Sequence, residues 1–169
     1  MSSHTKLIIL RGNSGSGKST TAKALQKKFG YGTMLISQDV IRRELLYVKD
    51  GIDTKAIPLL IDLAAYGRKN CEVVIIEGIL NATWYQGLFT TLLSEYDNNI
   101  YAYYFDLPFE ETLIRHMKKP NCNDFGEAEM RKWWMEKDYI GIIKEKIIRK
   151  ELSLDEIVSM IYSDIIRGY

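Results

Sequence analysis

One short stretch constrains the fold of this chain more than any other. The run GNSGSGKS lies near the N-terminus, is followed by a threonine, and fits the phosphate-binding pattern G-x-x-x-x-G-K-[ST]. Glycines at such positions let the backbone adopt positive φ angles and approach a phosphate without a Cβ clash. We expect the whole motif to bind the phosphates of a nucleoside triphosphate. Its members are Gly12, Asn13, Ser14, Gly15, Ser16, Gly17, Lys18, Ser19 and Thr20.

The chemistry of the motif assigns a role to its parts. Backbone N–H groups of the loop form a nest for anions, and the positive end of the following helix lies behind it. The Lys18 ammonium is expected to reach the β- and γ-phosphates, and the Ser19 hydroxyl to ligate Mg²⁺. The context agrees, because an apolar run at 7–10 precedes the motif and a helical pattern at 20–29 follows it. The stretch therefore predicts binding of a nucleoside triphosphate with Mg²⁺.

Composition limits the other possibilities. A chain of 169 residues with 46% hydrophobic and 27% charged residues is typical of one globular domain, here 1–169. A net charge of +1 gives no general attraction to nucleic acid or to an anionic membrane, although a local basic groove is still compatible with it. Cys71 and Cys122 match no metal or redox spacing and are interpreted as free thiols. With no long apolar run, we expect a cytoplasmic protein without signal peptide or membrane span.

Apolar runs alternate with helical patterns along the whole chain. Strands are expected at 7–10, 33–37, 72–78, 100–106 and 145–149, and helices at 20–29, 40–48, 53–69 with a bend near Pro58, 81–96, 108–119, 127–137 and 153–167. This order predicts right-handed βαβ units and an α/β fold, with a parallel sheet covered by helices on both faces. Ligands of such sheets bind at the carboxyl ends of the strands, so polar residues that follow strands are candidates for the site.

Asp39 follows the second expected strand. A carboxylate in this place could accept the proton of a hydroxyl group that attacks the γ-phosphate. The alternative role is that of a helix N-cap. Arg42 lies three residues further along the expected helix, on the same face, where it could bind a substrate or fix the Asp39 carboxylate.

Glu77 ends the most strand-like run of the chain, which is apolar on both faces. Burial of a carboxylate at such a place is costly without a partner. We therefore interpret Glu77 as a residue that holds Mg²⁺, directly or through water, or orients the attacking group. A purely structural hydrogen-bonding role is the alternative.

A basic helix end is followed by a polar loop between 115 and 126. Arg115 is a candidate for stabilising charge on the transferring phosphoryl group, just before a small mobile lid expected at about 117–130, and Arg131 beyond the lid is a candidate for substrate contact. The alternative is a solvated helix end with favourably placed cations. Trp133 and Trp134 are adjacent on a helix and point about 100° apart, so we expect at least one of them in the core.

Four segments together resemble small P-loop kinases of the adenylate-kinase-like class. They are 12–20, 37–42 (SQDVIR), 75–80 (IIEGIL) and 105–112 (FDLPFEET). The pattern is most similar to the chloramphenicol phosphotransferase, zeta-toxin and polynucleotide-kinase groups, and Gly78-Ile79-Leu80 is similar to uridine kinases. The resemblance implies a three-layer fold with a five-stranded sheet of order 2-3-1-4-5, ATP with Mg²⁺ as cofactors, Asp39 as the catalytic base, and Arg115 as a lid arginine that also stacks on adenine.

The sequence departs from nucleoside monophosphate kinases in its lid. Lys118, Lys119 and Pro120 stand where that class would have further arginines, which favours a hydroxyl acceptor over a phosphate-bearing one. We expect an ATP-dependent phosphotransferase that acts on a hydroxyl group of a small molecule. One alternative is a polynucleotide 5′-hydroxyl kinase, which the near-neutral charge does not favour. Another is a nucleotide-dependent switch, but the base-reading motif N-K-x-D of GTPases is absent from the chain.

Overall fold

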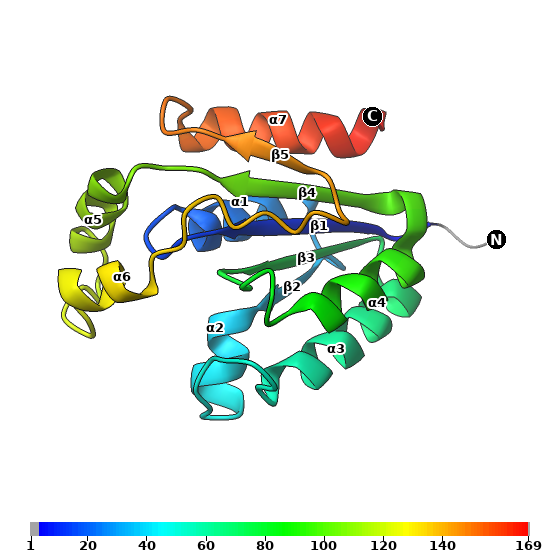
Figure 1. Ribbon diagram of the computed structural model, residues 1–169. Coiled ribbons are helices and arrows are strands. Elements are labelled where there is room, and N and C mark those ends of the chain that lie inside the picture. The colour runs from blue at the N-terminus through cyan, green and yellow to red at the C-terminus, as the bar shows by residue number, and fades with distance from the viewer. Residues whose placement is uncertain (1–3, 169) are drawn as a thin grey trace.

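The computed structural model describes residues 4–168. A parallel sheet of five strands, in the order β2-β3-β1-β4-β5, forms its centre (Figure 1). The strands are β1 (Lys6–Gly12), β2 (Met34–Ser37), β3 (Val73–Gly78), β4 (Ile100–Phe105) and β5 (Glu145–Ile148). Their register places the ends of β2 and β3 side by side, with Ser37 opposite Glu77. The predicted fold class and strand order are confirmed.

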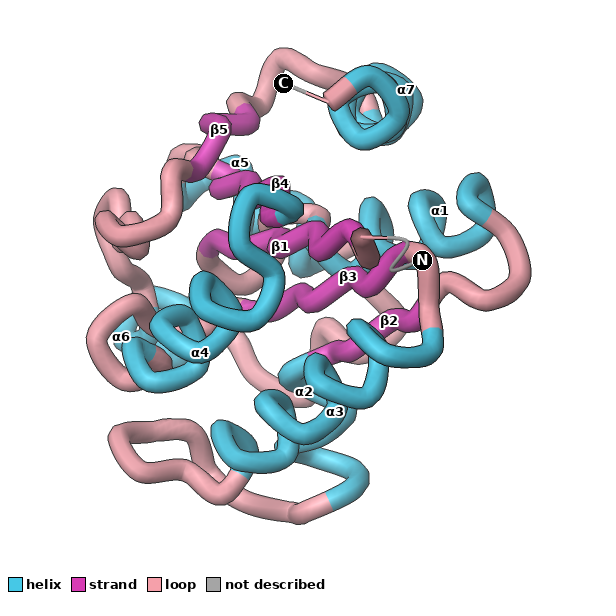
Figure 2. Tube along the Cα trace, turned by 90° about the vertical axis from the view of Figure 1, so that its right-hand side faces the viewer, coloured by secondary structure: helices cyan, strands magenta, loops and turns pink. Residues whose placement is uncertain are grey.

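Helices cover both faces of the sheet (Figure 2). α1 (Lys18–Phe29) and α7 (Leu154–Arg167) pack on one face, and α3 (Ala56–Asn70) and α4 (Gln86–Tyr96) on the other. The central strand β1 serves both cores, because Ile8 and Leu10 point to the α1 side and Leu7 and Ile9 to the α3 side. A strand buried on both faces is apolar at every position, and this explains the continuous run at 7–10.

Two helices lie beyond the carboxyl ends of the strands instead of on a face of the sheet (Figure 1). They are α5 (Phe109–Met117) and α6 (Glu127–Trp133). This end of a parallel sheet is where ligand sites form. The lid expected at about 117–130 corresponds to the end of α5, the connecting turns and the first half of α6.

The helix expected at 40–48 is wrong in type and length. A three-residue α-helix, α2 (Gln38–Val40), passes into a five-residue π-helix, η1 (Ile41–Leu45). The Leu46 N–H donates to the carbonyl oxygen of Ile41, five residues back, at 2.9 Å. Tyr47 then adopts a φ of 53°, which ends the helix. Single π-turns of this kind are frequent at functional sites.

Pro58 does not bend the helix expected at 53–69. α3 begins at Ala56, so Pro58 lies in its first turn. An N–H at that position would have no partner within the helix, and its loss therefore costs little. The helix ends one residue later than expected, at Asn70.

The helix expected at 81–96 begins at Gln86 instead. Asn81 Oδ1 accepts the N–H groups of Thr83 and Trp84, at 3.0 and 2.9 Å. An asparagine that bonds its own backbone two and three residues on forms a turn that competes with helix. α6 is likewise shorter than expected, because it ends at Trp133 and not at 137.

The last helix begins with a reciprocal capping box, as expected. Ser153 Oγ accepts the Glu156 N–H at 3.2 Å, and the Glu156 carboxylate accepts the Ser153 N–H at 2.7 Å. Two of the unpaired donors at the helix start are thereby satisfied. Within residues 4–168, no helix has the length and apolar character that crossing a bilayer requires.

Candidate functional site

The phosphate-binding motif forms the turn between β1 and α1. Gly12 has a φ of 145° and Gly15 a φ of 78°. A Cβ on Gly12 would lie 2.8 Å from the carbonyl oxygen of Phe105, and one on Gly15 would overlap the carbonyl oxygen of Thr112. Both positions therefore require glycine. The loop therefore packs closely against the backbone at the end of β4 and in the first half of α5.

Lys18 is buried inside this loop, with only 7% of its surface exposed. Its ammonium donates to the backbone carbonyl of Asn13 at 2.7 Å and to Ser16 Oγ at 3.2 Å. Burial lowers the pKa of Lys18 from 10.5 to about 8, and the negative charge of Glu77 partly opposes this shift. A phosphate group supplies the full negative charge that this buried cation lacks.

Glu77 joins the motif to the ends of two strands. The hydroxyls of Ser19 and Ser37 both donate to Glu77 Oε1, at 3.1 and 2.6 Å, and the residue is 3% exposed. Carboxylate and hydroxyl oxygens are the hard ligands that Mg²⁺ prefers. In the described part of the chain, no group of three or more histidine, cysteine or acidic side chains could hold a metal ion. Ser19 and Glu77 thus fit a Mg²⁺ ion that draws its other ligands from phosphate and water.

Asp39 stands at the end of β2, with 60% of its side chain exposed. One carboxylate oxygen accepts a hydrogen bond from the Arg42 guanidinium at 3.2 Å, and Arg43 approaches the same oxygen at 3.8 Å. Arg42 itself is largely buried, and its Nε has no hydrogen-bond partner among the described residues. The structure therefore brings Asp39 and Arg42 together, and leaves the carboxylate open on its other side.

Arg115 reaches back from α5 to the phosphate-binding loop. Its guanidinium donates to the carbonyl of Ser16 at 3.1 Å and to Glu111 at 2.9 Å. Arg115, Lys118 and Lys119 line a cavity of about 350 Å³, together with loop residues 15–17 and with residues 152–154, where α7 begins. A nucleotide base is of a size to enter this space beside the loop.

Arg131 lies elsewhere. Its guanidinium pairs with Glu127 at 2.7 Å and lies 4.2 Å from the centroid of the Phe109 ring. Arg131 lies on α6, and these two contacts join it to residues of α6 and of the start of α5, not to the phosphate-binding loop. The expectation that Trp133 or Trp134 is in the core is wrong, because Trp133 is 41% exposed and Trp134 is half-buried. α6 packs beyond the sheet and buries only Met130.

Arg11 is a site neighbour that the sequence reasoning missed. It directly precedes Gly12, is fully buried, and pairs with Asp138 at 2.9 Å and Glu145 at 2.8 Å. It also donates two hydrogen bonds to the carbonyl of Leu80. The signal was an arginine at the end of an apolar strand, a position where a charge needs buried partners.

Gln38 is a second missed residue, and it supports the turn after β3. Its Oε1 accepts the Leu80 N–H at 3.1 Å, and its Nε2 donates to Asp50 and to the Tyr85 hydroxyl, at 3.0 and 2.6 Å. Leu80 is buried and has a φ of 46°, which is strained for a leucine. Gln38 accepts the N–H of Leu80 and Arg11 donates to its carbonyl, so both backbone groups of this strained residue are hydrogen-bonded. Leu80 lies three residues beyond Glu77.

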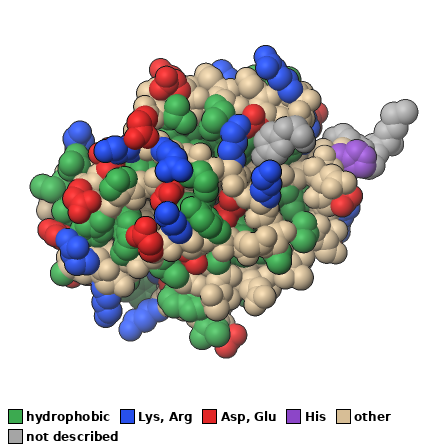
Figure 3. All heavy atoms as spheres, turned by 45° about the horizontal axis from the view of Figure 1, so that its top comes forward, with side chains coloured by type: hydrophobic (Ala, Val, Ile, Leu, Met, Phe, Trp, Pro, Cys, Tyr) green, Lys and Arg blue, Asp and Glu red, His purple; other side chains and the backbone are tan. Residues whose placement is uncertain are grey.

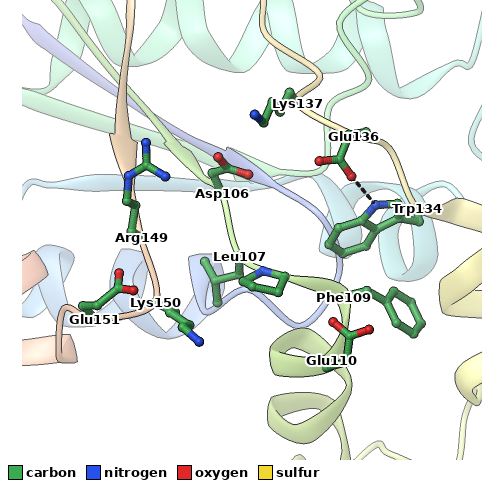
Figure 4. A pocket seen from close by; sticks show the side chains of 11 residues that line it. Asp106, Leu107, Phe109, Glu110, Trp134, Glu136, Lys137, Arg149, Lys150 and Glu151 are labelled. Carbon is green, nitrogen blue, oxygen red and sulfur yellow. Dashed lines mark hydrogen bonds between the residues drawn. The ribbon is translucent and has the colours of Figure 1, made fainter.

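A separate pocket of about 510 Å³ lies outside the phosphate-binding loop (Figure 4). The pocket is lined by residues 106–110, 134, 136, 137 and 149–151. Figure 4 shows Asp106 and Arg149 on one side and Trp134, which donates to Glu136 at 3.1 Å, on the other. No residue of the motif lines this pocket, so it is distinct from the site around Lys18.

Comparisons with known proteins identify the family and the fold of the chain. The family named AAA_33 and described as an AAA domain matches residues 7–137. No curated protein matches the sequence. Among solved structures, the fold is similar to that of the Mycobacterium tuberculosis APS kinase CysC in complex with AMPPNP and APS, with a TM-score of 0.69 and 17% identity over 98% of this chain and 99% of that one.

Two further structures share the fold. A gluconokinase from Sinorhizobium meliloti 1021 has a TM-score of 0.65 and 17% identity, over 97% of this chain and 93% of that one. A chain of the Pnkp1/Rnl/Hen1 RNA repair complex has a TM-score of 0.57 and 21% identity, over 89% of this chain and 51% of that one. At these identities the likeness shows the fold alone.

Proposed function

We propose that this chain, which belongs to the AAA_33 family of small P-loop kinases, transfers the γ-phosphoryl group of ATP to a hydroxyl group of a small-molecule acceptor. One observation carries the proposal. The exposed carboxylate of Asp39 stands at the same edge of the sheet as the buried cluster of Ser19, Ser37 and Glu77, and is open to a ligand on one side. An open carboxylate beside a phosphate-binding loop is the arrangement that a general base for phosphoryl transfer needs.

ATP binding follows from the family and from the loop. The triphosphate lies in the backbone nest of residues 12–20, with the Lys18 ammonium on the β- and γ-phosphates. The base enters the cavity between Arg115 and residues 152–154. Arg115 already contacts the loop through Ser16, so its charge also acts on the transferring group.

Ser19 and Glu77 would hold the Mg²⁺ ion that this family implies. Their oxygens are already within hydrogen-bonding distance of each other, at 3.1 Å. A bound Mg²⁺ neutralises phosphate charge and fixes the orientation of the triphosphate. Ser37 donates to the same Glu77 oxygen and keeps that carboxylate in place.

The reaction is a direct transfer. The acceptor oxygen bonds to the γ-phosphorus while the bond from that phosphorus to the β–γ bridging oxygen breaks, and ADP leaves with the electron pair. Asp39 takes the proton of the acceptor hydroxyl. Arg42 holds the Asp39 carboxylate from one side, at 3.2 Å, and so orients its free side toward the acceptor. Lys18 and Arg115 stabilise the charge on the transferring group.

The alternative of a polynucleotide 5′-hydroxyl kinase has weaker support. A structure of an RNA repair complex shares the fold, but the net charge of the chain is only +1. On the one face that Figure 3 shows, basic and acidic side chains are interspersed. A groove for a polynucleotide needs clustered cations. A GTPase-like switch is also disfavoured. Residues 138–141 match D-x-x-G, but the Asp138 carboxylate pairs with Arg11 and supports the fold there.

The test is ATP consumption with a panel of hydroxyl acceptors. The panel holds nucleosides, sugars, sugar acids, aminoglycoside and phenicol antibiotics, and a 5′-hydroxyl oligonucleotide. We expect one small-molecule class to raise turnover well above the rate without acceptor. A response to the oligonucleotide alone would favour the polynucleotide kinase. Tight ATP binding without any acceptor response would favour the switch.

A further inference from the structure

Asn13 belongs to the phosphate-binding motif, but its side chain is hydrogen-bonded to Met135, far outside the motif. We infer that Asn13 is a positioning residue that couples the state of the phosphate-binding loop to the lid helix α6. This inference rests on the proposed nucleotide binding. It assigns to a residue inside the motif a role that needs no contact with the nucleotide.

Asn13 makes a two-pronged contact with the chain that follows α6. Its Nδ2 donates to the carbonyl of Met135 at 2.7 Å, and its Oδ1 accepts the N–H of Met135 at 2.9 Å. The side chain is buried, with the residue 7% exposed. The two bonds fix both backbone groups of Met135, two residues after the end of α6 at Trp133. Any displacement of Asn13 is therefore passed to the end of the lid helix.

The backbone of Asn13 supplies the other half of the link. Its carbonyl accepts the Lys18 ammonium at 2.7 Å. Phosphates of a bound nucleotide compete for the same ammonium, because a full negative charge attracts it more strongly than a carbonyl does. Nucleotide binding thus changes the restraint on Asn13, whose side chain holds Met135. Hydrogen bonds thus link Lys18 through Asn13 to Met135, two residues after the end of α6.

The next part of the chain is anchored in a different way. Arg11 donates to the carbonyl of Asp138 at 2.8 Å and pairs with its carboxylate at 2.9 Å. Arg11 is fully buried on β1, so this anchor stays fixed. Of these two anchors, the Asn13 contact is the one that starts from the phosphate-binding loop. The segment 134–138 is therefore held at Asp138 by Arg11 of the sheet, and at Met135 by Asn13 of the phosphate-binding loop.

The lid has a built-in reporter. Trp134 lies between the end of α6 and Met135, and its ring meets Phe109 edge-on at 5.3 Å, as the neighbouring side chains in Figure 4 show. Trp133 meets Phe125 of the lid turn at 5.0 Å. A change in the position of α6 changes the surroundings of both indoles. The third tryptophan, Trp84, is replaced by phenylalanine in the experiment, so that all tryptophan fluorescence comes from Trp133 and Trp134.

The experiment titrates the Trp84→Phe protein with a non-hydrolysable ATP analogue and Mg²⁺. Calorimetry measures binding, and tryptophan fluorescence measures the lid response. Asn13→Ala removes both bonds, and Asn13→Leu removes them while keeping the side-chain volume. For both variants we expect a dissociation constant within about threefold of the parent, a fluorescence response reduced to a small fraction, and a kcat about tenfold lower at saturating acceptor.

Gln26→Ala is the matched control. The side-chain amide of Gln26 also donates to a backbone carbonyl, that of Thr33 at 3.0 Å, but it does so near the C-terminal end of α1, far from the phosphate-binding loop. We expect this variant to keep the full fluorescence response. Absence of nucleotide binding in the parent protein would contradict the proposed function itself. A parent that binds without a lid response, or Asn13 variants that keep it, would overturn the inference. The inference would also be overturned if both Asn13 variants lost the fluorescence response and also unfolded at a much lower urea concentration than the parent protein. The Asn13–Met135 contact would then serve only to stabilise the fold.

Discussion

Lys18 shows how a single residue connects the fold to nucleotide binding. The loop buries its ammonium among carbonyl and hydroxyl oxygens, and burial lowers its pKa to about 8. Protonation of Lys18 in the folded protein is therefore harder than in the unfolded chain. Bound phosphates should raise the pKa of Lys18 again, since an opposite charge nearby favours the protonated form.

The pH dependence of binding follows from this shift. Below pH 8, Lys18 is already protonated, so nucleotide affinity should not change through this group. Above pH 8, binding must take up a proton, and the dissociation constant should rise by up to about tenfold per pH unit. Calorimetry between pH 7 and 10 measures how steeply the dissociation constant rises with pH. The Lys18→Arg variant, whose side chain stays charged, should show no such rise. The Lys18→Ala variant should have no turnover. A flat profile up to pH 9.5 in the parent protein would contradict this account.

Asp39 carries the second prediction at the residue scale. Asp39→Asn keeps the size of the side chain and removes its ability to take a proton. We expect kcat to fall by roughly 10²-fold or more, as for the loss of a general base, with little change in the KM for ATP. Steady-state kinetics with the best acceptor measure both constants. An unchanged kcat would remove Asp39 from its role as base.

At the scale of elements, the helices that carry clear local signals were predicted best. The capping box of Ser153 and Glu156 marks the start of α7 in the sequence, and the structure contains it. The segment after β2 was predicted worst. Its apolar spacing resembles an α-helix, but the chain forms a π-helix that ends in a strained Tyr47. Tertiary contacts such as those of Gln38 decide this region, and local spacing does not contain them.

The capping box yields a prediction for element stability. Ser153→Ala removes the oxygen that accepts the Glu156 N–H, and should lower the free energy of unfolding by about 1 kcal/mol. Ser159→Ala is the control, because Ser159 is exposed in the middle of the same helix and alanine is the better helix former. Urea unfolding measures both. Equal effects of the two substitutions would show that the cap contributes nothing specific.

At the scale of the whole molecule, Arg11 joins parts that are far apart in the chain. It bonds the turn after β3, the segment after α6, and β5. Removal of one partner from a buried ion pair leaves an uncompensated charge, so Arg11→Met should lower the free energy of unfolding by about 3 kcal/mol or more.

An exposed pair of the same length serves as the comparison. Arg68 and Glu95 are also 2.9 Å apart but lie at the surface. Arg68→Met should change stability by less than about 1 kcal/mol. Guanidinium chloride unfolding of the two variants measures the difference, and an equal loss in both would contradict a special role for burial.

The sequence allowed the phosphate-binding loop, Glu77 and Asp39 to be proposed as a site because each lies at or just after the carboxyl end of an expected strand. Strand order then brings the ends of β1, β2 and β3 together. Arg11, Gln38 and the Asn13–Met135 contact could not be predicted in the same way. Their partners lie between 12 and 134 residues away, and which side chain meets which depends on packing that no local pattern records.

In the proposed reaction the γ-phosphoryl group of ATP moves to an acceptor hydroxyl, and the destination of this group can be followed directly. ATP labelled in the γ-phosphate is incubated with the protein and the most active acceptor of the panel, and the labelled products are separated. We expect most of the label in a phosphate ester of the acceptor, and almost none there with Asp39→Asn. Label released only as inorganic phosphate, at a rate that the acceptor does not change, would contradict the account.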